Sequence, residues 1–227
     1  ARINPKCVVP TLIHDGKIIR ESTVICEYAD ETFPDRPICP NDAFGRAQMR
    51  VWTKAVDEIY HPATRVVTFA AAHRYTMLDK PADERERLLQ EIPDPARRET
   101  KRQSIEFGFD FPEAAAGLFV YQKMIKDMEH ALSETEWLAG DTYSLADTAL
   151  TIYVNRLSVL SMSGMWEDRC PKVADWWERV RARPSFQPAV VDWVPEDLIH
   201  SLRENGKKSW PRVKEILDAG ASEAVTA

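Results

Sequence analysis

The chain has 227 residues, a formal net charge of -6 and 29% charged residues. This acidic balance argues against nucleic acid as a main partner, because phosphate binding requires a basic face. No apolar run approaches the roughly 18 residues of a membrane helix, and no signal peptide is visible. The composition therefore predicts a soluble, cytoplasmic globular protein without a membrane partner.

The first 33 residues carry the strand signals. Thr11 to Ile13 forms an apolar run, Asp15-Gly16 is a strong turn signal, and residues 17–20 read as the return strand of a β-hairpin. A helix is expected to follow from Ser22. Prolines at every third position then make 34–41 a stiff linker.

Helical patterns fill the chain from residue 42 onward. We expect a long helix over 42–74 that bends at Pro62, and short helices near 82–91 and 95–104. Apolar stripes at helical spacing predict two core helices, over 118–132 and 173–180. The chain is thus an α+β protein, with a small β-containing piece, an all-helical bundle over 42–218 and a disordered tail over 219–227.

The segment "WLAGDTYSLADTAL" (137–150) contains a capping box. The Ser144 hydroxyl can accept from the N–H of Asp147, whose carboxylate can accept in return from the N–H of Ser144. The helix behind it is apolar on nearly all sides, so we expect it to be the buried centre of the bundle. The predicted role of Ser144 and Asp147 is therefore structural.

The four cysteines, Cys7, Cys26, Cys39 and Cys170, form no Cys-x-x-Cys pair, and the five histidines are scattered. We expect free thiols in a reducing compartment. The sequence predicts neither a metal site nor a Cys-His nucleophilic pair.

Three segments in order resemble the cytosolic glutathione transferases: "NPKCVVPTLIHDGKIIRESTVICEYADETFPD", "RAQMRVWTKAVDE" and the capping-box segment above. The resemblance implies that 1–33 is the second half of a thioredoxin-like domain and that 42–218 is the helical domain. It also implies a cytoplasmic homodimer that acts in detoxification, with glutathione as co-substrate and a hydrophobic, aromatic electrophile. The insertion "IPDPARRETKRQSIEFGF" is similar to one in bacterial transferases related to the lignin β-etherases.

The resemblance also implies glutathione-binding residues. A cis Val9–Pro10 peptide would turn the backbone of Val9 toward the cysteinyl unit, whereas the alternative is a proline that only protects a strand start. Glu21 would bind the γ-glutamyl ammonium, and Ser22, as N-cap, the γ-glutamyl carboxylate; the alternative is a plain helix cap beside a solvated acid. Lys6 would pair with the glycine carboxylate or remain a solvated loop lysine.

Further residues are implied on the long helix. Asp57 would reach the glutathione of a partner subunit, or serve as a surface or interface charge. Tyr60, His61 and Thr64 would line the pocket for the second substrate.

Two departures from the family stand out. Cys7 replaces a usual glycine and is expected to be a tolerated small residue rather than a reactive thiol. The first β-α-β unit of the family, which carries the Ser, Tyr or Cys that activates the thiol, is absent, so we expect a fragment and assign no catalytic residue. The sequence leaves three functions open: glutathione conjugation, glutathione-dependent aryl-ether cleavage, and a non-catalytic glutathione-fold binding or stress protein.

Overall fold

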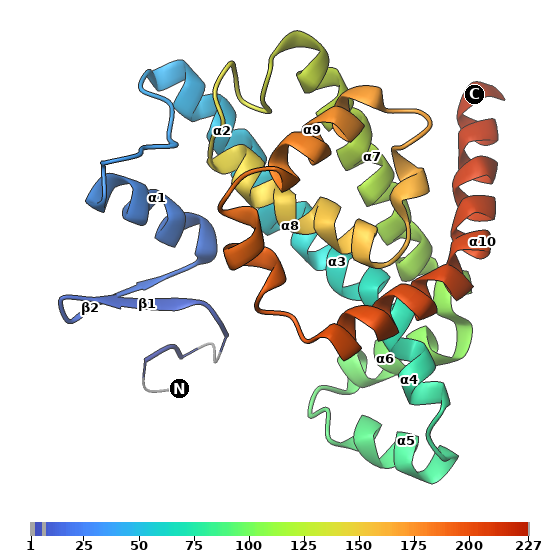
Figure 1. Cartoon of the computed structure of the whole chain (residues 1–227). Coiled ribbons are helices and arrows are strands. Elements are labelled where there is room, and N and C mark those ends of the chain that lie inside the picture. The colour runs from blue at the N-terminus through green and yellow to red at the C-terminus, as the bar shows by residue number, and fades with distance from the viewer. Residues whose placement is uncertain (1–2, 6–7, 227) are drawn as a thin grey trace.

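The computed structural model describes residues 3–5 and 8–226, and of 221–226 it describes the backbone. A hairpin and one helix lie at one end of the molecule, and a helical bundle forms the rest (Figure 1). The hairpin end comprises β1 (Thr11–His14), β2 (Lys17–Arg20) and α1 (Ser22–Thr32). The bundle comprises α2 (Ala43–Ala55), η1 (Val56–Tyr60), α3 (His61–Thr68), η2 (Phe69–His73), α4 (Arg74–Leu78), α5 (Ala82–Gln90), α6 (Pro95–Phe107), η3 (Gly108–Asp110), α7 (Pro112–Glu134), α8 (Leu145–Val159), η4 (Ser163–Met165), α9 (Pro171–Arg181), η5 (Gln187–Val191) and α10 (Glu196–Thr226).

The predicted hairpin is present. Its antiparallel register pairs Thr11 with Arg20 and His14 with Lys17. Asp15 and Gly16 have φ values of 49° and 74°, as a two-residue turn that follows the strand twist requires. The His14 Nδ1 atom lies 2.8 Å from the Tyr28 hydroxyl, so the hairpin is tied to α1.

The linker is held by the end of α1. The Asp30 carboxylate accepts hydrogen bonds from the backbone N–H groups of Ile38 (2.7 Å) and Cys39 (3.1 Å). The Arg50 guanidinium forms a bidentate ion pair with Glu27, with a shortest distance of 2.6 Å. These contacts fix the small β-containing piece against the start of the bundle.

The long helix of the bundle runs from Ala43 to Leu78 and contains two π-helical turns, η1 and η2. The predicted interruption at Pro62 is found: η1 ends at Tyr60, and Pro62 lies in the first turn of α3. Proline has no backbone N–H and cannot donate a helical hydrogen bond. The wider π turn before Pro62 accommodates this missing hydrogen bond. The second π turn, and the extension of the helix beyond residue 74, were not expected from the sequence.

The helix α8 is buried within the bundle on one side, whereas Ile152 on another side is exposed. Leu150, Val154 and Leu157 of α8 are fully buried between α2, α9 and α10. The two predicted apolar stripes are buried on α7 and α9. The helix α10 crosses η2, where the Ser209 hydroxyl donates to the carbonyl of Ala71 (2.8 Å).

In the structure the backbone of 219–226, which was expected to be disordered, continues α10. The physical reason is composition, since this segment contains several alanines and no proline, and alanine is the strongest helix former. Residue 227 lies outside the described part of the chain.

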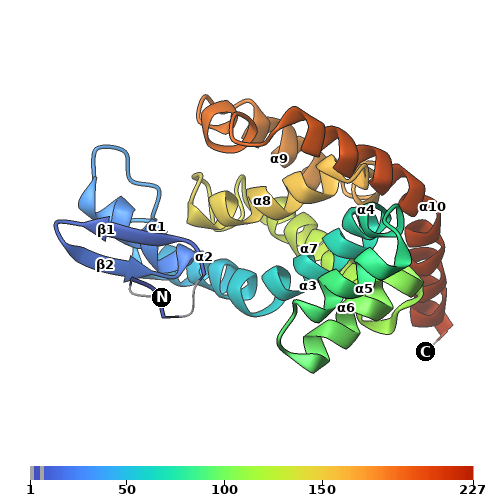
Figure 2. The same cartoon turned by 90° about the horizontal axis from the view of Figure 1, so that it is seen from below.

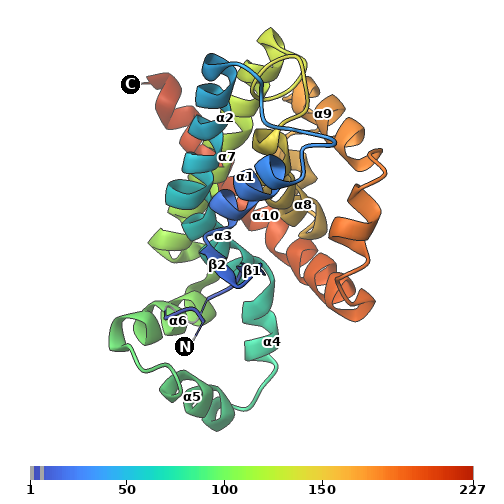
Figure 3. The ribbon, with the colours of Figure 1, turned by 90° about the vertical axis from the view of Figure 1, so that its left-hand side faces the viewer.

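The helices α5 and α6 project from one side of the bundle (Figures 2 and 3). They correspond to the predicted short helices, and α6 extends three residues beyond the expected end at 104. Among the helices of the described residues, none combines the length and apolar character needed to cross a membrane.

The capping box at the start of α8 is larger than predicted. The carboxylate of Asp147 is fully buried and accepts from the backbone N–H groups of Ser144 (2.9 Å) and Leu138 (3.1 Å). It also accepts from the Ser144 hydroxyl (3.2 Å) and from Nε1–H of Trp176 (2.8 Å). Burial raises the pKa of Asp147, and these hydrogen bonds oppose that rise.

We expect Asp147→Ala to lower the free energy of unfolding by about 3 to 5 kcal/mol, because three buried N–H donors lose their acceptor. Urea denaturation measures the change. The control is Asp175→Ala, which removes a largely exposed carboxylate paired with Arg179 and should cost less than about 1 kcal/mol. Equal losses in the two variants would contradict a central role for Asp147.

Candidate functional site

The hairpin register brings two predicted binding segments together. Because Thr11 pairs with Arg20, the residues before Thr11 and those after Arg20 lie at the same end of the hairpin. Val9–Pro10 and Glu21–Ser22 are those residues. The peptide bond between Val9 and Pro10 is cis, as predicted.

The backbone of Val9 lies at the surface of this end of the hairpin. Its residue surface is 92% exposed, and among the described residues its backbone N–H and C=O have no hydrogen-bond partner. The neighbouring carbonyl of Val8 accepts from the Asn4 side-chain amide (2.8 Å). An extended segment with such free backbone groups can pair with a peptide in the manner of an added strand.

The turn into α1 differs from the prediction. Glu21, with φ 66° and ψ 119°, is the N-cap, and Ser22 is the first helical residue. The assignment of Ser22 as N-cap is therefore wrong, because β2 ends at Arg20 and leaves a single residue to make the turn. A positive φ is unfavourable for glutamate, and strain of this kind often occurs at ligand-binding sites.

The start of α1 offers donors for an anion. The first helical hydrogen bond runs from the N–H of Ile25 to the carbonyl of Glu21 (2.9 Å). The N–H groups of Ser22, Thr23 and Val24 therefore precede the helical hydrogen bonds and lie at the positive end of the helix dipole.

A cavity of about 230 Å³ lies beside this helix start, between α1 and the helices α2 and α8. Ser22 lies at this cavity, and its other walls are mainly apolar. The lining residues are Ser22, Thr23, Cys26, Thr53, Val56, Leu145, Thr148, Ala149, Ile152 and Tyr153.

The predicted residues of the long helix divide between two places. Asp57 accepts a hydrogen bond from the Thr23 hydroxyl (2.8 Å), so it lies next to the helix start that carries Ser22. The Tyr60 ring packs edge-on against the Tyr153 ring, with 6.4 Å between centroids. Its neighbour His61 has Nδ1 3.4 Å from the Tyr153 hydroxyl.

Thr64 is turned toward the bundle interior. Its hydroxyl donates to the carbonyl of Tyr60 (2.7 Å) and lies 2.8 Å from the hydroxyl of the buried Tyr121. The structure therefore brings Tyr60 and His61 together at Tyr153 and places the Thr64 hydroxyl at Tyr121 instead.

The tyrosines of this region keep their protons at neutral pH. Desolvation raises the pKa of Tyr60 and of Tyr153 to about 12, and it also raises that of Tyr121. Their hydroxyls are hydrogen-bond donors rather than bases in this environment.

The described cysteines, Cys26, Cys39 and Cys170, are free thiols whose pKa values are raised by desolvation. Desolvation and the neighbouring Asp30 carboxylate raise the pKa of Cys39 to about 12, and Cys170 is buried with a raised pKa. Cys26 lies at the cavity as a free thiol. Lys6 and Cys7 lie outside the described residues. Among those described, no group of three His, Cys, Asp or Glu side chains is arranged to hold a metal.

Sequence reasoning missed Thr23 and Tyr153. Tyr153 had a usable signal, because a tyrosine on an otherwise apolar buried helix needs a polar partner for its hydroxyl. Thr23 had none, since its partner Asp57 is 34 residues away in the sequence.

Comparison with known proteins identifies relatives over most of the chain. Residues 1–37 match the family described as glutathione S-transferase, N-terminal domain, and residues 119–188 match glutathione S-transferase, C-terminal domain. Protein LigF of Sphingobium sp. (strain NBRC 103272 / SYK-6) is 32% identical over 212 residues, which are 89% of this chain and 81% of the relative. Glutathione S-transferase U25 of Arabidopsis thaliana is 24% identical over 88% of this chain and 73% of its own.

Solved structures agree. The crystal structure of beta-etherase LigF from Sphingobium sp. strain SYK-6 superposes with a TM-score of 0.68 at 30% identity, over 82% of this chain and 79% of that one. Glutathione transferase F7 from Populus trichocarpa gives a TM-score of 0.59 at 25% identity, over 82% and 76% of the two chains.

The raised pKa of Tyr153 leads to a spectroscopic prediction. The unfolded chain releases this proton near pH 10 and the native chain at about 12, so stability falls as the pH rises through that window. At about pH 10, native Tyr153→Phe should show the same phenolate absorbance as the native wild type. In denaturant, a tyrosine is about half ionised at this pH. The phenolate absorbance of the variant should therefore be lower than that of the wild type by about half of one tyrosine's signal. A clear native difference at that pH would show that the hydroxyl is solvated.

Proposed function

The chain belongs to the glutathione S-transferase superfamily, and on that premise we propose that it joins glutathione to a hydrophobic, aromatic electrophile. The observation that carries the proposal is the convergence of the Val9 backbone and the start of α1 at one end of the hairpin.

In the proposed complex, glutathione lies along this end of the hairpin. The backbone of Val9, before Pro10, pairs with the cysteinyl unit. The Ser22 hydroxyl and the first N–H groups of α1 bind the γ-glutamyl carboxylate, and Glu21 binds the γ-glutamyl ammonium. Lys6 pairs with the glycine carboxylate. The positive φ of Glu21 supports this arrangement, because it turns the chain sharply between strand and helix.

The proposed reaction is a displacement. The glutathione thiolate forms a C–S bond to the electrophilic carbon while the bond from that carbon to its leaving group breaks. The thiol-activating residue stays unassigned. We propose that Tyr60 and His61 line the second-substrate pocket with Tyr153, and that Thr64 supports it through Tyr121.

We further propose that the protein acts in detoxification as a cytoplasmic homodimer. Asp57 would then reach the glutathione of the partner subunit or orient Thr23 within its own. The hydrogen bond from Thr23 favours the second role.

Ser22→Ala should weaken glutathione binding about tenfold, the effect of one hydrogen bond to a charged group. Titration calorimetry measures this. Ser133→Ala, at an exposed position near the end of α7, is the matched control and should bind as the wild type does. An unchanged affinity in Ser22→Ala would return Ser22 to a purely structural role.

The similarity to LigF favours a second candidate, the glutathione-dependent cleavage of a β-aryl ether. Here the thiolate would attack the carbon that carries the aryloxy group, the C–O bond would break, and the aryloxide would leave and take up a proton. We expect the protein to release the phenol from a model β-aryl ether only when glutathione is present. Phenol is quantified beside conjugation of an aryl halide; conjugation without phenol release would exclude ether cleavage.

A further inference from the structure

A second cavity lies between the long helix and α6. Its volume is about 290 Å³, and its walls combine cationic and apolar side chains, chiefly Arg65, Val66, Phe69, Ile92, Arg97 and Lys101. Figures 1 and 2 both place α6 far from the hairpin, so this cavity is separate from the proposed glutathione site.

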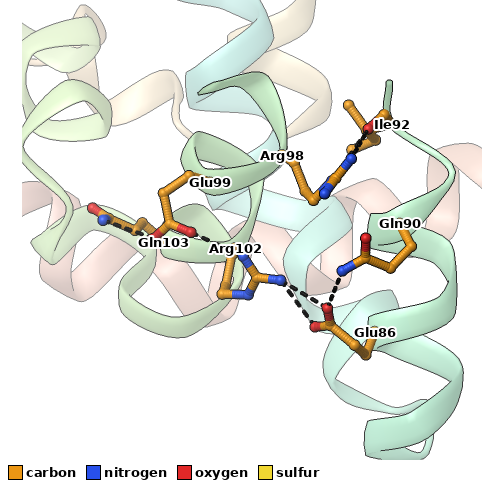
Figure 4. Close-up of polar contacts among 7 residues, drawn as sticks. All are labelled: Glu86, Gln90, Ile92, Arg98, Glu99, Arg102 and Gln103. Carbon is orange, nitrogen blue, oxygen red and sulfur yellow. Dashed lines mark hydrogen bonds and ion pairs between the residues drawn. The ribbon is translucent and has the colours of Figure 1, made fainter. Parts of the chain in front are cut away.

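The cationic residues of α6 fall into two groups. Arg98 donates to the carbonyl of Ile92 (2.8 Å), and Arg102 pairs with Glu86 and Glu99, each at 2.9 Å (Figure 4). Arg97 and Lys101 each lie one residue earlier and line the cavity instead. Arg98 is thus bound to a backbone carbonyl and Arg102 to two carboxylates, whereas Arg97 and Lys101 form no ion pair among the described residues.

The cations at the cavity lack carboxylate partners. Among the described residues, no carboxylate lies within 4.0 Å of Arg65, Arg97 or Lys101. Glu113 also lines the cavity but forms no ion pair with them. The balance of charge around the cavity is therefore positive.

Lys101 combines contact with an apolar cluster and a lowered pKa. Its ammonium lies 3.2 Å from the centroid of the Phe69 ring, over a small buried cluster of Phe69, Leu89 and Ile105. Desolvation, followed by the repulsion of Arg65, lowers its pKa to about 8. A partly desolvated charge without a counter-ion is costly, and a bound anion would offset that cost.

We propose that this cavity binds a small amphipathic carboxylate, an anion with an aryl or alkyl body. The carboxylate would accept from Lys101 and from the guanidinium groups of Arg65 and Arg97, for which a planar, bidentate acceptor is well matched. The body would contact Val66 and Ile92. The volume is at the lower end of ligand pockets, which restricts the ligand to a small molecule.

Titration calorimetry with 4-phenylbutyrate tests the proposal, with the neutral 4-phenylbutyramide as analogue. The acid should bind at least about tenfold more tightly than the amide, and Lys101→Met should remove most of that difference. Methionine keeps an apolar stem in contact with Phe69. The matched control, Lys123→Met on the exposed face of α7, should bind the acid as the wild type does. The far-ultraviolet circular dichroism of each variant verifies folding.

A second variant covers the case in which Lys101→Met does not fold. Arg97 is exposed, so Arg97→Gln should fold normally and weaken the acid about three- to tenfold. Equal binding of acid and amide, no loss in either variant, or no binding at all would overturn the proposal.

The titration repeated with saturating glutathione separates this site from the proposed catalytic one. An unchanged affinity for 4-phenylbutyrate is expected, and so is an unchanged affinity in Ser22→Ala. Competition with glutathione would place the acid in the other cavity and overturn the proposal. If glutathione does not bind to the protein, 4-phenylbutyrate is still expected to bind with the same affinity.

Discussion

The buried carboxylate of Asp147 is the interaction on which the rest of the molecule depends. It joins the loop at Leu138, the start of α8 and the indole of Trp176 on α9. A buried charge is tolerated only when its hydrogen bonds are complete, so these three segments have one stable arrangement. The position of α8 follows from it. Through Tyr153, α8 then sets the surroundings of Tyr60 and His61 and one wall of the cavity beside α1.

The proposed glutathione site is attached to this frame by polar contacts rather than by a shared core. No residue of α1 is buried, and the attachment consists of the Glu27–Arg50 ion pair, the Asp30 contacts to the linker and the Thr23–Asp57 hydrogen bond. Exposed ion pairs contribute little, and a two-stranded hairpin is marginal by itself. The hairpin end should therefore open locally before the bundle does, which is common for ligand-binding regions.

The sequence was informative wherever a signal was local. The Asp-Gly turn, the capping box and the apolar stripes each depend on residues within about four positions of one another, and all are found in the structure. The length of the turn before α1 depends on where β2 ends, so Ser22 was misplaced at the N-cap. Thr23 and Tyr153 join the site through contacts across the fold, which no periodicity encodes. The tail was expected to be disordered because it is terminal, whereas its alanines favour the helix that the backbone adopts.

The two π turns in the long helix determine the direction in which the side chains that follow them point. Each holds about one residue more than an α turn, so everything behind it is rotated by about 100° relative to an uninterrupted helix. The side chains of α3, His61 and Thr64 among them, face where they do because of η1. Deletion of a single residue from η1 would turn the side chains of α3 in another direction without altering any loop. Relatives that differ by one residue within this helix would then share a fold and present different surfaces at the proposed second-substrate pocket.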